Sequence, residues 1–269
     1  MFGAALGDIV GSKYEFMPIK SKDFVFLDDG MDYTDDTIMT VAVAEALIDS
    51  DISKEEETKN NLIASMRKWG RRYPHPTGAY GSMFSSWLRS SSPKPYNSWG
   101  NGSAMRVSAS GWLYNTIEET RKAAMLSSIV THNHPEGIKG AEATASAIFL
   151  ARTGEGKESI KRYIEKEFGY DLSRKIEEIR ETYSFDGSCQ GTVPESIICF
   201  LEGIDAEDTI RNAISLGGDA DTMGAIAGSI AEAYWKEDLS EMVKPYLPDD
   251  LYTVLSSIKI IAYSRISDF

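Results

Sequence analysis

Gly217-Gly218-Asp219-Ala220-Asp221-Thr222-Met223-Gly224 joins two glycines, two carboxylates and a hydroxyl to the start of an apolar run. Residues 225–233 are mainly alanine, isoleucine and glycine, which predicts a buried helix with the acids in the turn that opens it. A helix N-terminus carries unpaired N–H groups and partial positive charge, so carboxylates are favoured there. An acidic helix cap is therefore one interpretation of this stretch.

A second stretch, Thr34-Asp35-Asp36-Thr37, repeats the chemistry ahead of another apolar helix at residues 38–48. Four carboxylates brought together by two such turns would repel one another unless cations lie among them. Oxygen ligands with no accompanying His or Cys are typical of magnesium, manganese or calcium sites rather than zinc sites. The two stretches together predict a site for divalent cations.

Helical periodicity runs through the rest of the chain, and strand-like alternation is nearly absent apart from the short run 24–27. A charged linker is expected at 51–59 and a loop at 187–192, with Thr192 capping the next helix. The prediction is an all-α fold: a single compact orthogonal helical bundle over residues 1–269, with a metal cleft at one end. The expected helices cover residues 2–14, 36–50, 61–73, 82–90, 104–114, 117–131, 135–153, two segments of 157–183, 193–201, 206–216, the run after Asp221, and 251–264.

Composition narrows the class of protein. The 269 residues include 42% hydrophobic residues and carry a net charge of −13, which argues against a nucleic-acid-binding surface. Two cysteines form no disulfide framework, no signal pattern opens the chain, and no run approaches the roughly 18 apolar residues of a membrane helix. A cytoplasmic protein that does not enter a membrane is expected.

Two glycine-rich stretches carry candidate site residues. Gly3, Gly7 and Gly11 predict close helix packing, and Glu15 after them is either a solvated acid or a further ligand or proton-transfer group. Gly100-Asn101-Gly102-Ser103 runs into a helix start that also includes Met105, where free N–H groups suit phosphate oxygens; a plain turn is the alternative.

Two histidines lie in Thr131-His132-Asn133-His134-Pro135. No Cys or third His is near them in sequence, which disfavours zinc. His134, just before a helix, is expected to hydrogen-bond a ligand or the backbone, and His132 to be a core histidine. Cys189 has no adjacent base, which argues against a nucleophilic role.

These motifs, in this order over residues 2–235, resemble the ADP-ribosylglycohydrolase family, the group of dinitrogenase-reductase-activating glycohydrolase and of the ADP-ribosylarginine and ADP-ribosylserine hydrolases. The resemblance implies an all-α fold and two Mg²⁺ or Mn²⁺ ions in a cleft. It implies metal ligands at Thr34, Asp35, Asp36, Asp219, Asp221 and Thr222. It also implies diphosphate contacts from Gly100, Asn101, Gly102 and Ser103, with Met105 beside them, and an ADP-ribose contact from His134.

The reaction implied by the resemblance is hydrolysis of the glycosidic bond between ADP-ribose and an acceptor. The general acid or base is Glu15, Asp35 or Asp36, which the sequence does not separate from pure ligands. The partner is an ADP-ribosylated protein, with arginine favoured, or a small molecule containing ADP-ribose; a nucleic acid would enter only as a modified-base substrate. The alternatives are a two-metal phosphohydrolase acting on a nucleotide diphosphate and a non-catalytic ADP-ribose-binding protein.

Overall fold

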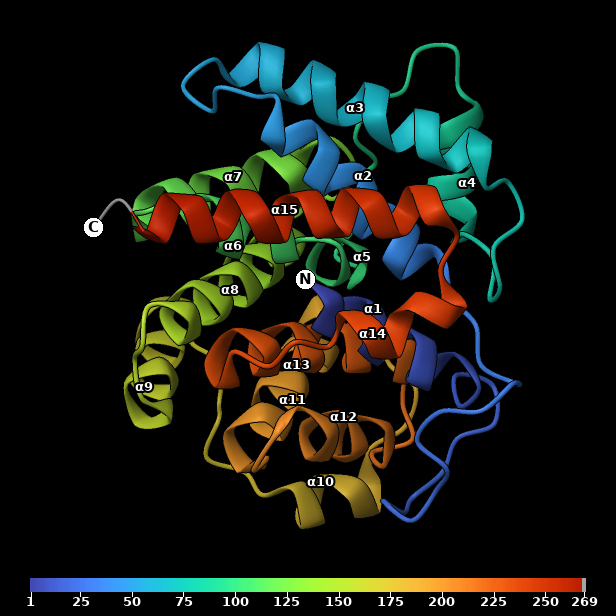
Figure 1. The fold of residues 1–269 in the computed structure, drawn as a ribbon, viewed down its shortest axis with the longest axis vertical. Coiled ribbons are helices and arrows are strands. Elements are labelled where there is room, and N and C mark those ends of the chain that lie inside the picture. The colour runs from blue at the N-terminus through green and yellow to red at the C-terminus, as the bar shows by residue number, and fades with distance from the viewer. Residues whose placement is uncertain (268–269) are drawn as a thin grey trace.

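The computed structural model describes residues 1–267, which form fifteen α-helices and one short 3₁₀ helix (Figure 1). Within this range there is no strand, and two isolated bridges pair Thr34 with Thr77 and Gly100 with Ser188. The all-helical prediction is confirmed. The helices are α1 (Phe2–Ser12), α2 (Asp35–Ile48), α3 (Glu55–Arg72), α4 (Ser82–Arg89), α5 (Gly102–Met105), α6 (Ser108–Leu113), α7 (Ile117–Ile129), α8 (Pro135–Arg152), α9 (Lys157–Phe168), α10 (Ile176–Thr182), α11 (Cys189–Glu202), α12 (Ala206–Ile214), α13 (Ala220–Trp235), α14 (Ser240–Val243), the 3₁₀ helix η1 (Lys244–Tyr246) and α15 (Asp249–Ser267).

Three of the predicted boundaries are wrong for identifiable reasons. The expected linker 51–59 is largely the first turn of α3, where three glutamates at positions 55–57 favour the helix N-terminus. The expected helix 104–114 is divided into α5 and α6 at Arg106. The expected loop before Thr192 is instead the start of α11, because the Ser188 hydroxyl accepts the N–H of Gly191 and caps the helix earlier.

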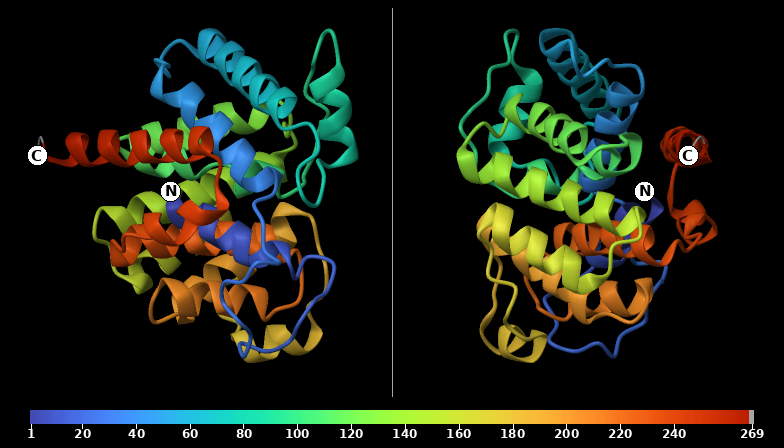
Figure 2. Two further views of the ribbon diagram at one scale, coloured as in Figure 1. Left: turned by 45° about the vertical axis from the view of Figure 1, so that its right-hand side comes forward. Right: turned by 90° about the vertical axis from the view of Figure 1, so that its left-hand side faces the viewer.

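The elements surround a centre made by α1 and α13 (Figure 1). Helix α13 also contacts α8, α11 and α12, while α15 contacts α2 and α6 and lies on the outside of the bundle (Figure 2). None of the helices in residues 1–267 combines the length and the apolar character needed to cross a bilayer. The prediction of one domain over residues 1–269 stays a prediction, and it includes residues 268–269, which lie outside the described part.

Helices α1 and α13 pack antiparallel with backbone against backbone. A Cβ atom on Gly7 would lie 1.9 Å from the carbonyl oxygen of Gly224, and one on Gly3 would lie 2.2 Å from that of Gly228. One turn further along, the contact of Gly11 is with the Ala220 backbone. This confirms that the glycines spaced four apart in α1 are packing positions. The contact also brings the end of α1, and with it Glu15, to the start of α13.

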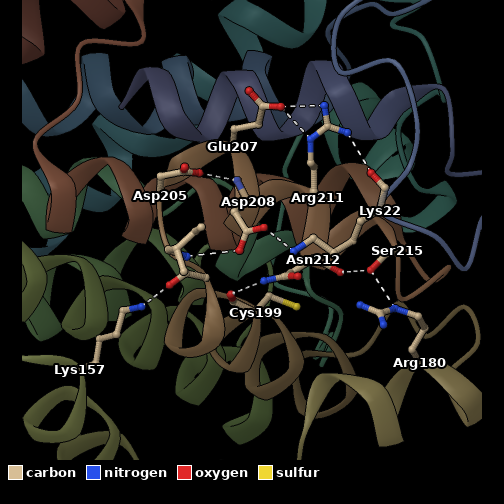
Figure 3. Close-up of polar contacts among 12 residues, drawn as sticks. Lys22, Lys157, Arg180, Cys199, Asp205, Glu207, Asp208, Arg211, Asn212 and Ser215 are labelled. Atoms are coloured by element: carbon tan, nitrogen blue, oxygen red, sulfur yellow. Dashed lines mark hydrogen bonds and ion pairs between the residues drawn. The ribbon is translucent and has the colours of Figure 1, made fainter.

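The segment 13–34, which follows α1, is tied down by basic side chains. Lys20 Nζ donates to the carbonyl oxygens of Tyr183 and Leu216 at 2.5 Å each, beside the turn that opens α13. Lys22 pairs with Asp208 of α12, and its carbonyl oxygen accepts a hydrogen bond from Arg211 (Figure 3). Arg211 also donates to the carbonyl oxygen of Phe24. These contacts hold the segment between Glu15 and Asp35 against α12. The two acids that flank the segment are therefore fixed relative to α13.

Candidate active site

A cleft of about 420 Å³ opens where the N-termini of α2, α5 and α13 meet. Five carboxylates from distant parts of the sequence reach it: Glu15, Asp35, Asp36, Asp219 and Asp221. The predicted convergence of acids from the two ends of the chain is therefore present in the structure. The other lining residues are Gly78, Ala79, Tyr80, Gly81, Ser82, Met83, Phe84, Tyr96, Ser98, Gly100, Asn101, Gly102, Met105, Arg106, His132 and Thr222.

Asp8 holds the turn that carries Asp35 and Asp36. Its carboxylate is fully buried and accepts four hydrogen bonds, from the N–H and the hydroxyl of Thr34 and of Thr37, at 2.5–3.0 Å. Thr34 Oγ1 also accepts the Asp36 N–H at 3.2 Å and caps α2. One lone pair of Thr34 Oγ1 remains, but Thr34 is fully buried and is not among the residues that line the cleft. Asp8 was not assigned a role from the sequence, although it follows Gly7 in the glycine-rich stretch that leads to Glu15.

The opposite wall is set by the turn at 217–221. Gly217 has φ +65°, a conformation that favours glycine, and it reverses the chain just before Asp219. Asn101 Nδ2 donates to Asp219 Oδ2 at 2.7 Å and to Thr192 Oγ1 at 3.1 Å. Asn101, which the sequence predicted to contact substrate, thus also orients a predicted metal ligand.

The acids strongly perturb one another. Burial, followed by the charge of Asp221, raises the pKa of both Asp35 and Asp36 well above its usual value. Burial, followed by the charge of Asp219, does the same for the pKa of Asp221. Burial and then the charges of Asp221 and Asp8 raise the pKa of Glu15 to about 8. The cluster therefore resists carrying its full negative charge without positive charge close by.

The donor set fits divalent cations. The Asp36 Oδ2 atom is buried and has no hydrogen-bond partner within residues 1–267, which leaves an acceptor in the cleft wall unsatisfied. Oxygen atoms of Glu15, Asp219 and Asp221 lie within 4.8 Å of one another, a spacing that a shared ion would bridge. Hard oxygen ligands of this kind suit Mg²⁺ or Mn²⁺. Thr222 lines the same cleft, one residue beyond Asp221.

The predicted substrate contacts divide into two groups. Gly100, Gly102 and Met105 line the cleft. Ser103 does not: its side chain is fully buried and its hydroxyl donates to the carbonyl oxygen of Gly137 at 2.7 Å. His134 is also outside the lining, because its Nδ1 accepts the N–H of Glu136 at 3.1 Å and caps α8. The structure therefore gives Ser103 and His134 local structural contacts.

His132 takes the place in the cleft that was predicted for His134. It is 6% exposed, and its Nε2 faces the glycine loop, at 3.2 Å from where a Cβ on Gly102 would lie. Its Nδ1 lies 2.7 Å from Thr131 Oγ1, which accepts a hydrogen bond from Arg106 Nη2 at 2.6 Å. Burial and then the charge of Arg106 lower the pKa of His132 well below its usual value, so the ring is neutral. Pro135 occupies the first position of α8, which makes His134 the helix cap. This proline is the sequence signal that assigns a capping role to His134 rather than to His132.

We expect the metal-free protein to lose stability as the pH rises from 5.5 to 8.5. The folded-state pKa of Glu15 is raised to about 8 and those of Asp35, Asp36 and Asp221 are also raised, so their stabilising contribution is present at low pH and is lost as the pH rises through these values. The measurement is Tm in chelator across this range, then with excess Mg²⁺ or Mn²⁺.

The cations should raise Tm far more at pH 8.5 than at pH 5.5, because protons compete with them for the same oxygens. Glu15→Gln should flatten the chelated profile, while Glu158→Gln on the surface of α9 serves as the matched control. A metal-free Tm that does not fall with pH, or an equal cation effect at both pH values, would contradict the cluster electrostatics.

Comparison with known proteins agrees with this geometry. The family model described as ADP-ribosylglycohydrolase matches residues 1–255. The chain is 26% identical over 310 residues to the ADP-ribosylhydrolase ARH3 of Bos taurus, covering 87% of this chain and 83% of the relative. It is 26% identical over 313 residues to the ARH3 of Homo sapiens, with 88% and 84% covered.

A solved structure titled "ADP-ribosylglycohydrolase-related protein complex" has the same fold, with a TM-score of 0.68 at 22% identity over 97% of this chain and 95% of the other. The match to the family model spans the acids of both cleft walls and the glycine loop between them. On these grounds the chain belongs to the ADP-ribosylglycohydrolase family.

Proposed function

We propose that this protein is a metal-dependent hydrolase that cleaves the glycosidic bond between ADP-ribose and an acceptor and releases ADP-ribose. The observation that carries the proposal is the set of five carboxylates around one cleft, which includes a buried Asp36 oxygen without a partner in the described part of the chain. Family membership and the glycine loop beside these acids support it. We also propose that the acceptor is an arginine or serine side chain of a protein and that the hydrolase is cytoplasmic.

The metal ligands in this proposal are Asp35, Asp36, Asp219, Asp221 and Thr222, whereas Thr34 lies outside the cleft lining and caps α2. When bound, a pair of Mg²⁺ or Mn²⁺ ions would neutralise the clustered acids, hold the ribose hydroxyls and polarise a water molecule. Asp8 and Asn101 keep the two ligand turns in place through the hydrogen bonds described above.

Glu15 is the proposed proton-transfer group, and its carboxylate also lies near enough to Asp219 and Asp221 to share a bound ion with them. It is only half-buried, lies at the cleft edge beside Gly78, and comes from a loop rather than from either ligand turn. A carboxyl group in that place reaches both the cleft interior and the solvent, as transfer of a proton to or from the leaving group requires. Asp35 and Asp36, the other predicted candidates, are assigned to cation binding because they lie deeper, beside the Asp8 turn.

His132 is the proposed contact to the phosphate or ribose oxygens of the ligand. Thr131 Oγ1 accepts from Arg106, and its own proton is best placed on His132 Nδ1 at 2.7 Å rather than on the Ser128 carbonyl oxygen at 3.4 Å. This assigns the hydrogen of the neutral ring to Nε2, which faces Gly100 and Gly102. Arg106 and Thr131 thus orient the His132 ring so that its Nε2–H can donate to the ligand.

Thr131→Val should weaken ADP-ribose binding about tenfold or more. Without the Thr131 hydroxyl the hydrogen of the His132 ring is no longer held on Nε2, and a hydrogen bond to a charged group contributes about 1.5–3 kcal/mol. His132→Gln keeps an N–H near the Nε2 position and should bind better than His132→Asn. The measurement is calorimetric titration with ADP-ribose. Thr153→Val, whose hydroxyl donates to Phe149 O, is the control. Equal affinities for the Thr131 variant and the wild type would contradict this role.

The direct test of the proposed function is product analysis. Incubation with arginine-, serine- and base-linked ADP-ribose in Mg²⁺ or Mn²⁺ should release intact ADP-ribose from at least one substrate. AMP with ribose phosphate would instead support a phosphohydrolase, and saturable ADP-ribose binding without product would support a non-catalytic binding protein. Either of these two results overturns the proposal.

A further inference from the structure

The charge of the chain is strongly segregated. Between Thr58 and Thr116 there are eight lysines and arginines and no aspartate or glutamate, in a chain with a net charge of −13. This stretch includes all of α4 and the part of α3 after its three glutamates, residues 58–72. The two helices contact each other at the end of the molecule opposite α10 and α12 (Figure 1). Lys59, Lys68 and Arg72 pair with carboxylates and Arg106 is buried. Among the described residues this leaves Arg67, Arg71, Arg89 and Lys94 without an ion pair, and such cations attract anions to their place.

Part of this basic stretch forms a hollow of about 410 Å³ between α3 and α4. Arg71, His75 and Arg89 line it, together with the hydroxyl-bearing Tyr80 and Ser85, and no carboxylate does. Within the described residues Arg71 and Arg89 form no ion pair, whereas the neighbouring Arg72 pairs with Asp250. Two unpaired guanidinium groups in one concavity match the double charge of a phosphate.

The hollow lies next to the part of the candidate active site that contains Glu15 and Asp35. Tyr80 lines both the hollow and the cleft, and burial followed by the charge of Asp35 raises its pKa. Two residues before Tyr80, Gly78 contacts Glu15, since a Cβ there would lie 2.9 Å from Glu15 Oε2. The cleft and the hollow therefore share a wall at Tyr80. An acceptor chain that extends from Glu15 past Tyr80 is the ligand that would contact Arg71 and Arg89.

We propose that this α3–α4 hollow is an anion subsite that binds a phosphate group carried by a peptide acceptor, close to the residue that bears ADP-ribose. A single phosphate suits it better than a nucleic-acid strand does, because the net charge of −13 repels a polyanion at longer range. The acceptor part of this inference rests on the proposed function, while the anion subsite itself does not.

The subsite is tested first without catalysis. The full chain in chelator is titrated with sodium phosphate at constant ionic strength and followed by ¹H–¹⁵N NMR. Saturable shifts should appear at residues 70–75 and 85–89. Arg71→Gln and Arg89→Gln should each weaken phosphate binding about tenfold, while Arg162→Gln on α9 should not change it. The Tm of each variant checks that it is folded.

Arg71 and Arg89 also lie in the last turns of α3 and α4, where a cation stabilises the helix. The phosphate titration distinguishes this stabilising role from phosphate binding. Unchanged phosphate affinity in both variants would overturn the subsite. Acetate binding as tightly as phosphate would overturn its assignment to phosphate. A 5′-phosphorylated oligonucleotide that binds more tightly than a phosphoserine peptide would overturn the peptide acceptor.

The acceptor is tested by comparing kcat/KM for an ADP-ribosylated peptide with and without a phosphoserine next to the modified residue. The phosphorylated peptide should be favoured about tenfold, and Arg71→Gln combined with Arg89→Gln should remove the preference. Equal kcat/KM values in the wild type would overturn the acceptor assignment. If neither peptide is hydrolysed, the proposed function fails, and the phosphate titration still decides the subsite.

Discussion

Asp221→Asn should abolish turnover, by about 10³-fold or more in kcat/KM, and weaken Mn²⁺ binding, while making the metal-free protein more stable at pH 8. The loss of activity follows because an amide replaces a negatively charged oxygen at the centre of the cluster. The gain in stability follows because burial and the charge of Asp219 disfavour the ionised Asp221 in the fold. The measurements are kcat/KM, Mn²⁺ titration and Tm in chelator.

The opposite directions of these effects distinguish loss of a functional charge from loss of the fold. Asp171→Asn is the matched control, because Asp171 lies exposed between α9 and α10 and outside the cleft. It should leave all three quantities close to wild type. Near-normal turnover in Asp221→Asn, or a lower metal-free Tm, would contradict the account of the cluster.

Gly7→Ala should destabilise the protein by more than about 3 kcal/mol, because overpacking here cannot be relieved by a side-chain movement. The new Cβ would lie 1.9 Å from the Gly224 carbonyl oxygen, so α1 must move away from α13. That shift also separates Glu15 from Asp219 and Asp221, so cation affinity should fall together with Tm. The Tm change should be at least about 6 °C.

Gly156→Ala is the control for this substitution, because no atom lies within 4 Å of its added Cβ. Its stability should stay within about 1 kcal/mol of wild type. If Gly7→Ala is as stable as Gly156→Ala, the close α1–α13 contact does not determine the position of Glu15.

The sequence predicted the features that depend on local pattern. The small-residue runs after Asp36 and Asp221 indicated the buried helices α2 and α13, and the glycines four apart in α1 indicated close packing. The convergence of the two aspartate pairs was inferred from the repeated pattern of two acids and a threonine before each buried helix. Their mutual repulsion was the reason to expect cations among them. The roles of these acids as ligands remain a proposal.

The features that depend on tertiary contacts were not predictable in the same way. His132 and His134 are two residues apart, and the choice between them follows from the Arg106–Thr131 contact and from capping of α8. Ser103 lies in a glycine-rich loop of the kind that binds phosphate, but its hydroxyl donates to the carbonyl oxygen of Gly137 in α8. The contacts that position His132 and Ser103 join residues remote in sequence, whereas the cap made by His134 is local and is indicated by Pro135.

The central claim is that the acids of the α2 and α13 turns bind a pair of divalent cations in one cleft. The most direct measurement is an anomalous difference map from crystals grown with Mn²⁺. The account predicts two peaks among Asp35, Asp36, Asp219 and Asp221, and their loss in Asp221→Asn crystals. Ordered side chains with no peak in the cleft, or Mn²⁺ bound only elsewhere, would contradict it.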